Sequence, residues 1–91
     1  MLNTTRHFAS GNLTATPSTT TDGIIVSNIS RMTGKVTSML IDIDLHDFVK
    51  SFHSWKGGEL IQNAFPDLTA DEREFVKTGI SPKEWVMMFG E

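Results

Sequence analysis

Cysteine is absent from this chain of 91 residues, which excludes disulfide bonds, thiol chemistry and thiolate metal sites. The fold must therefore be held together by packing, and a reducing compartment fits this composition. Long apolar runs are also lacking: the run from Trp85 to Phe89 is among the longest, whereas a membrane span needs about 20 residues. Residues 1–20 contain no apolar block of the kind found in secretory signals. We therefore expect a cytoplasmic protein that does not cross a membrane.

The sequence also lacks a cluster of basic residues. The chain has 8 Lys+Arg against 11 Asp+Glu, and no segment of the sequence gathers the basic residues together. Proteins bind nucleic acids mainly through phosphates, which requires a clustered basic face, so we expect no nucleic-acid partner. The acidic excess lies after residue 58, at Glu59, Asp67, Asp71, Glu72, Glu74, Glu84 and Glu91. This distribution favours a partner with a basic protein surface.

Residues 1–22 are rich in Thr, Ser and Asn and have few large apolar side chains. Such a segment buries too little apolar surface to offset the entropy cost of ordering it, so we predict a flexible N-terminal arm. An alternative uses Phe8 and the alternating Leu13 and Ala15, which could add one short strand to a sheet or reach a neighbouring subunit. The single compact domain is expected over residues 23–91.

Two apolar runs after the arm predict a β-hairpin. They cover residues 24–29 and 36–43 and are separated by a polar turn at residues 31–35. In the second run Met39 and Ile41 alternate with more polar residues, which indicates one apolar face. Because an isolated hairpin is only marginally stable in water, we expect the segments that follow to cover this face.

After the predicted hairpin, apolar residues recur at the spacing of a helix. Asp44 is placed to cap a helix whose apolar residues recur at helical spacing as far as Trp55, and glycines 57 and 58 end it. A short helical piece then stops at Pro66. We predict an α+β domain in which a β-hairpin or small antiparallel sheet is covered by three or four short helices. The predicted core consists of Ile25, Met39, Ile41, Phe48, Phe52, Trp55, Ile61, Phe65, Phe75, Ile80, Trp85 and Phe89.

Two helix starts lie close together near the C-terminal end. Thr69 and Glu72 have the spacing of a capping box, in which each side chain bonds the other residue's backbone amide. Ser81, Pro82 and Glu84 repeat this start signal for the last helix. The two signals predict a helix that ends near residue 78 and another that begins at once.

The junction between these helices is predicted to be a structural corner. Gly79 is placed to end the first helix in the left-handed conformation. A Schellman ending would bring Ile80 against Phe75, and a hydrophobic staple would bring the same residue against Trp85. We therefore expect Phe75, Gly79, Ile80 and Trp85 to fix the angle between the two helices.

The C-terminal half carries the run W-x-x-G-E-x-I-Q-x-A-F-P-x-L-T-x-D-E-R-E-F-x-x-T-G-I-x-P-x-E-W, from Trp55 to Trp85. With the strand and turn from Ile29 to Gly34, this run resembles a group of small uncharacterised proteins from phages and related mobile elements, over residues 24–91. The resemblance implies a phage-type origin, and it implies no reaction.

Groups that could be mistaken for catalytic or metal sites have simpler interpretations. His46 and His53 share a helix with Asp47, yet Lys50 lies between the histidines on the same face, where it would repel a metal and pair with Asp47. Lys56 with the two following glycines lacks the longer frame of a phosphate-binding P-loop. No nucleophile, base and acid occur in a catalytic spacing. We predict no metal, no cofactor and no enzymatic activity.

The last helix offers a candidate interaction surface. At about 100° per residue, Trp85, Met88 and Phe89 can face the core together, whereas Met87 points away and Val86 lies at the margin. Flexible Met side chains are favoured at adaptable binding surfaces. We therefore select Val86, Met87 and the neighbouring Lys83 as candidate interaction residues.

Two functional hypotheses follow from these observations. The first is a non-enzymatic phage accessory protein that acts inside the host cell by binding a host or phage protein, in the manner of host-takeover or anti-defence proteins. The second is a small virion or assembly component whose N-terminal arm orders against neighbouring subunits. The second hypothesis includes association with further copies of the chain.

Overall fold

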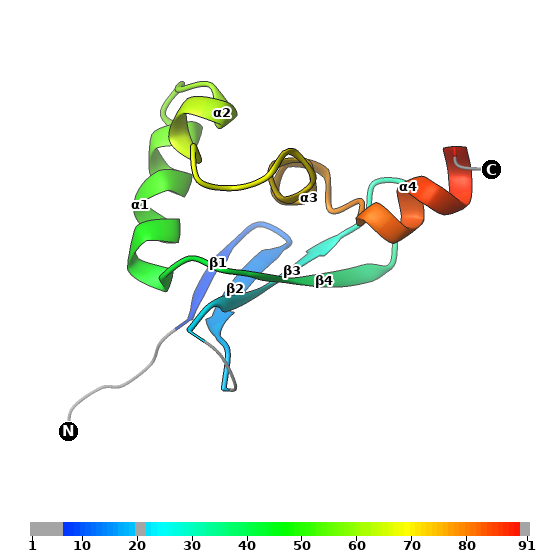
Figure 1. Cartoon of the computed structure of the whole chain (residues 1–91), viewed down its shortest axis with the longest axis horizontal. Helices are drawn as coiled ribbons and strands as arrows, with labels where there is room; N and C mark the ends of the chain where they lie inside the picture. Colours follow the sequence, from blue (N-terminus) through cyan, green and yellow to red (C-terminus); the bar gives the residue numbers. More distant parts are fainter. Residues whose placement is uncertain (1–6, 20–21, 90–91) are drawn as a thin grey trace.

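The computed structural model describes residues 7–19 and 22–89, with the side chains of Met88 and Phe89 outside the description. The described chain forms four strands followed by four helices (Figure 1). The strands are β1 (Phe8–Ser10), β2 (Leu13–Pro17), β3 (Ile24–Ile29) and β4 (Val36–Ile41). The helices are α1 (Leu45–Lys56), α2 (Ile61–Ala64), α3 (Ala70–Thr78) and α4 (Pro82–Phe89). This arrangement confirms the prediction of a small α+β fold.

The four strands form one antiparallel sheet in the order β1-β2-β3-β4, so each strand pairs with its neighbour in the sequence. One row across the sheet joins Ala15 to Val26 and Val26 to Met39. Figure 1 shows α1, α2 and α3 on the same side of the sheet. We call the opposite side the open face. Thr16 and Leu40 are exposed there, in one row across the sheet with Ile25.

Residues 8–17 form β1 and β2, where a flexible arm was expected. The reason is that Leu13 and Ala15 alternate onto the covered face and are buried there, so this short segment does contribute to the core. Phe8 adds an edge-on contact to Phe52, with 5.1 Å between ring centroids. The extra-strand alternative therefore described this segment better, although the chain forms two strands and not one. Residues 1–6, 20 and 21 of the predicted arm lie outside the described residues.

The predicted β3–β4 hairpin is confirmed, but its inner face differs at β3. Ile24 and Val26 are buried, whereas the predicted core residue Ile25 is half-buried on the open face opposite Leu40. Three consecutive apolar residues show no alternation, so the strand alone cannot indicate which side chains face inward. The register with β4 determines which side chains of β3 face inward, because Ile24 pairs with the buried Ile41.

Six of the predicted core residues are buried: Ile41, Phe48, Phe52, Phe65, Phe75 and Ile80. Five others are half-buried: Ile25, Met39, Trp55, Ile61 and Trp85. Phe89 was also predicted, but its side chain lies outside the description. The aromatic rings are the largest contributors, since Phe48 contacts both Phe52 and Phe65 at centroid distances of 6.1 and 5.4 Å. Burial of these rings joins α1 and the segment after α2 to the sheet.

Helices α1 and α3 begin at the capping residues that the sequence predicted. Asp44 Oδ2 accepts a hydrogen bond from the His46 amide at 2.9 Å at the start of α1. Thr69 and Glu72 form the full capping box of α3, with reciprocal bonds of 2.8 and 3.1 Å. These bonds satisfy amides that the first turn of a helix leaves without a partner.

The end of α3 corrects one prediction. The Gly79 amide donates to the Phe75 carbonyl at 2.7 Å, and Gly79 has a φ of 76°, which together define the simpler αL ending. A Schellman ending would send the Ile80 amide to the Phe75 carbonyl. That amide instead donates to Thr78 Oγ1 at 3.1 Å.

Candidate functional site

The three predicted interaction residues are all exposed on α4. The exposed fractions are 65% for Val86 and 75% for Met87, and Lys83 is exposed one turn earlier. We call Lys83, Val86 and Met87 the contact face. Figure 1 shows α4 at one end of the sheet, on the far side of α3 from α1 and α2.

The first turn of α4 is fixed by hydrogen bonds. The Ser81 amide donates to Glu84 Oε1 at 3.0 Å, and the Glu84 amide donates to Ser81 Oγ at 3.3 Å. The second carboxylate oxygen, Glu84 Oε2, accepts from Thr33 Oγ1 at 3.0 Å, and Thr33 lies in the β3–β4 turn. One carboxylate therefore caps α4 and attaches it to the hairpin.

These bonds favour the charged form of Glu84. The pKa of this carboxyl lies below its ordinary value, chiefly because the Ser81 amide donates to it. Partial burial opposes the shift, while the hydroxyls of Thr33, Ser30 and Ser81 support it. Glu84 is thus ionised at neutral pH and holds its position as a charge-assisted acceptor.

The junction between α3 and α4, where the structural corner was predicted, lies against the end of the hairpin. Phe75 and Ile80 are buried and Trp85 is half-buried. The Gly79 carbonyl accepts from Thr37 Oγ1 at 2.6 Å, and the Thr78 carbonyl accepts from the Arg31 amide at 3.1 Å. These contacts could not be predicted from the sequence, because nothing in the local helix signals indicates which strand lies against the junction.

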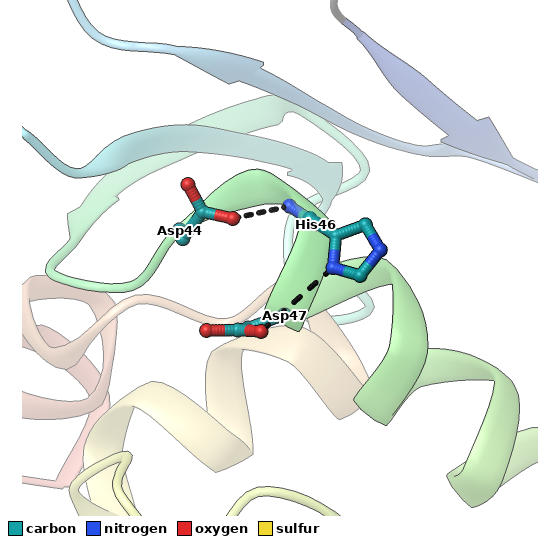
Figure 2. Close-up of side chains that lie close together, drawn as sticks. All are labelled: Asp44, His46 and Asp47. Atoms are coloured by element: carbon teal, nitrogen blue, oxygen red, sulfur yellow. Dashed lines mark hydrogen bonds and ion pairs between the residues drawn. The ribbon is translucent and has the colours of Figure 1, made fainter.

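Three exposed side chains at the start of α1 carry atoms that can ligate a metal ion and lie close together. One ligand atom from each of Asp44, His46 and Asp47 lies within 4.8 Å of the others, and Figure 2 shows them grouped around the first helical turn. Capping accounts for this geometry, since Asp44 is the N-cap and accepts from the His46 amide. His53 is not among the grouped residues; its ring lies 5.8 Å from that of Phe8.

The ion pairing at this position differs from the prediction. Among the residues that the structure describes, the recorded partner of Asp47 is His46, with 3.9 Å between Nδ1 and Oδ1, and not Lys50. Both side chains are largely exposed, so solvent screens their attraction. The trio therefore serves the start of the helix, and we assign no metal to it.

A cavity of about 340 Å³ brings together basic residues that are far apart in the sequence. Its lining includes Arg31 after β3, Lys56 at the end of α1 and Lys77 near the end of α3, and contains no carboxylate. We call this cavity the basic pocket. Folding thus brings residues of three separate segments to one cavity, although no segment of the sequence gathers the basic residues together.

The cations of the basic pocket have few competing partners. The carbonyls at the helix ends are already bonded: Trp55 O accepts from the Gly58 amide at 3.1 Å, and Val76 O accepts from Asn28 Nδ2 at 3.4 Å. The Lys56 ammonium lies over the Trp55 ring, 4.4 Å from its centroid. Within the described part of the chain, the recorded ion pair involves none of the three cations. The pocket can therefore receive an anionic group.

No family model, curated protein or solved structure matched the chain in the comparisons made. Among the described residues, no helix has the length and apolar character required to cross a membrane. The contact face and the basic pocket are therefore the features of the molecule that indicate a function.

Proposed function

We propose that the chain is a non-enzymatic binding module that attaches to another protein through the contact face of α4. The observation that carries this proposal is the exposure of two adjacent apolar side chains, Val86 and Met87, on a helix whose first turn is held in place. Burying an exposed Val or Met side chain gains about 1.5–3 kcal/mol, which makes such residues suitable anchors. Methionine also adapts its shape to a partner.

The partner proposed is a host or phage protein. The resemblance of residues 24–91 to small phage and mobile-element proteins supports this choice. The second hypothesis, a virion component with an arm that orders only on neighbouring subunits, loses its motivating observation. Residues 8–17 pair within a single chain, so that part of the arm needs no neighbour to become ordered.

Affinity capture from a bacterial lysate tests the proposal with the full chain as bait. Met87→Asp places a charge in the contact face and should remove the specifically captured proteins. Leu60→Asp is the matched control, because Leu60 is 61% exposed just before α2, on a different part of the molecule. Capture that is the same with all three chains, or lost with both variants, would contradict the proposal.

The basic pocket favours a second candidate function, the binding of a small ligand that carries a phosphate group. Three cations suit a dianion better than a single carboxylate, and the pocket falls within the usual range of about 300–1,000 Å³ for ligand sites. Trp55 lines the pocket and reports on its occupancy. No residue of α4 lines the basic pocket, so the two candidate functions use different side chains.

Fluorescence titration with inorganic phosphate and pyrophosphate tests the second candidate. A Trp85→Phe background leaves Trp55 as the single indole. We expect saturable quenching that weakens with rising salt and by at least about tenfold in Lys77→Ala, since one charge-assisted contact contributes about 1.5–3 kcal/mol. Lys35→Ala changes an exposed cation outside the pocket and should bind as the parent does. Equal weakening in both variants would refute the site.

A further inference from the structure

Strand β4 forms one edge of the sheet, and its register reveals which backbone groups face outward. The Ser30 amide donates to the Lys35 carbonyl at 2.9 Å, in the register that continues the β3–β4 ladder. Hydrogen-bonded pairs alternate in an antiparallel ladder, so the backbone groups of Thr37 and Met39 point toward β3. Those of Val36, Ser38 and Leu40 point away from the sheet.

An independent contact supports this assignment. Side chains approach most closely at the pairs that do not exchange backbone hydrogen bonds. Ser27 and Ser38 form such a pair, and their hydroxyl oxygens lie 2.7 Å apart. Among the hydrogen bonds recorded for the described residues, none uses the outward groups of β4.

Strand β4 lacks the features that normally protect an edge. Its six residues, VTSMLI, include no charge and no proline, and all six pair with β3 without a bulge. The exposed fractions are 70% for Val36 and 49% for Leu40, and both lie on the open face beside Ser38. The edge at β1 is much shorter, with three residues. A long, apolar and uncharged edge is a template for another strand.

We infer that β4 pairs in antiparallel fashion with β4 of a second copy of the chain, about a twofold axis through Ser38. The outward groups of Val36 would then bond those of Leu40 of the second copy, and Ser38 would bond its own equivalent. Every outward amide and carbonyl of the three residues finds a partner in this register. The two four-stranded sheets become one continuous sheet.

Side chains and charges both favour a second copy in this orientation. On the open face, each Val36 meets a Leu40 across the new ladder, and the two Ser38 hydroxyls extend the existing contact with Ser27. Lys35 precedes the strand and Asp42 follows it. Antiparallel pairing places Lys35 of one copy opposite Ile41 of the other, one residue from its Asp42, at both ends of the pair, whereas parallel pairing would place like charges together.

Sedimentation of the wild-type chain from low micromolar to about 1 mM gives the first test. We expect a concentration-dependent shift from the 10.1 kDa monomer to twice that mass. Ser38→Lys sets two ammonium groups opposite each other on the axis and should weaken association about tenfold or more. Thr16→Lys adds the same charge to the open face away from the edge and should associate as wild type does.

Cross-linking gives a second test, which does not depend on a destabilised variant. The chain has no cysteine, so Ser38→Cys introduces a single thiol. Opposite residues of a hydrogen-bonded pair lie about 5.5 Å apart, within the range that a disulfide bridges, so oxidation should yield a covalent dimer. Thr16→Cys should remain monomeric. A wild-type chain that stays monomeric at every concentration, or equal cross-linking of the two variants, overturns the inference.

Discussion

The α-carbon of Gly79 packs directly against the carbonyl group of Ile29. A β-carbon at residue 79 would overlap the carbonyl oxygen and lie 2.8 Å from the carbonyl carbon. This contact joins the end of α3 to the end of β3, and it explains why the corner between α3 and α4 sits where it does. Both the left-handed φ of 76° and the lack of a side chain are needed here.

Replacement of Gly79 by alanine should therefore destabilise the chain for two reasons. Gly34 is the matched control, because it has the same φ of 76° but no atom within 4 Å of an added β-carbon. Gly34→Ala should lose about 1–2 kcal/mol of unfolding free energy through backbone strain alone. Gly79→Ala should lose clearly more, because the end of β3 must also move. Equal losses in urea denaturation would show that the close approach to Ile29 does not matter.

The inner face of β3 can be tested with two adjacent isoleucines. Ile24→Ala removes a fully buried side chain and should cost about 2–5 kcal/mol of unfolding free energy. Ile25→Ala removes a half-buried side chain from the open face and should cost markedly less. Urea denaturation at low protein concentration, where self-association is minimal, measures both. A larger loss for Ile25→Ala would reverse the assignment of the two faces.

Hydrogen exchange tests whether β2 is an ordered strand. Thr14 and Ala15 have strand neighbours on both sides, in β1 and β3. Their amides should exchange as slowly as those of the central residues of β3, since opening them requires disruption of the sheet. The amide of Asn12, in the turn between β1 and β2, should exchange faster. Exchange of Thr14 and Ala15 at the rate of an unfolded chain would restore the flexible-arm interpretation.

Titration of Glu84 tests the attachment of α4. Its pKa is lowered in the folded chain, so this carboxylate stabilises the fold above the ordinary value of 4.5, and the stabilisation is lost as the pH falls through the folded pKa. The stability difference between wild type and Glu84→Gln should therefore be larger at pH 7 than in acid.

An NMR titration of the side-chain carboxyl gives the direct measurement and a control. The Glu84 midpoint should lie below 4.5 in the wild type. Thr33→Val removes one of the supporting hydroxyl donors and should raise the midpoint only partly, because the Ser81 amide is the main cause of the shift. A midpoint at or above 4.5 in the wild type would contradict the hydrogen bonding at the start of α4.

Local signals in the sequence predicted the helices well. Thr69 and Glu72 interact within a single turn, so their spacing alone is sufficient to predict the capping box. Met87 was placed correctly because the angular period of one helix determines which side chains point away from its apolar stripe.

Features that depend on distant segments could not be predicted in this way. The burial of Ile24 in place of Ile25 follows from pairing with β4, and composition alone hides the strands that Leu13 and Ala15 anchor. Among the features that bear on function, the basic pocket depends most clearly on distant segments. Arg31, Lys56 and Lys77 come from three segments that meet only after the helices pack on the sheet, so no spacing in the sequence indicates it.

The strand order of the sheet also determines the order in which the domain can assemble. Each strand pairs with its neighbour in the sequence, and such local pairings form quickly. The N-terminal part of a chain emerges first during synthesis, so the strands leave the ribosome before α1 and α3 do. Until they follow, the apolar face around Ala15 and Val26 is uncovered. The nascent chain on the ribosome is thus the form most exposed to aggregation, and the form in which a chaperone would matter most.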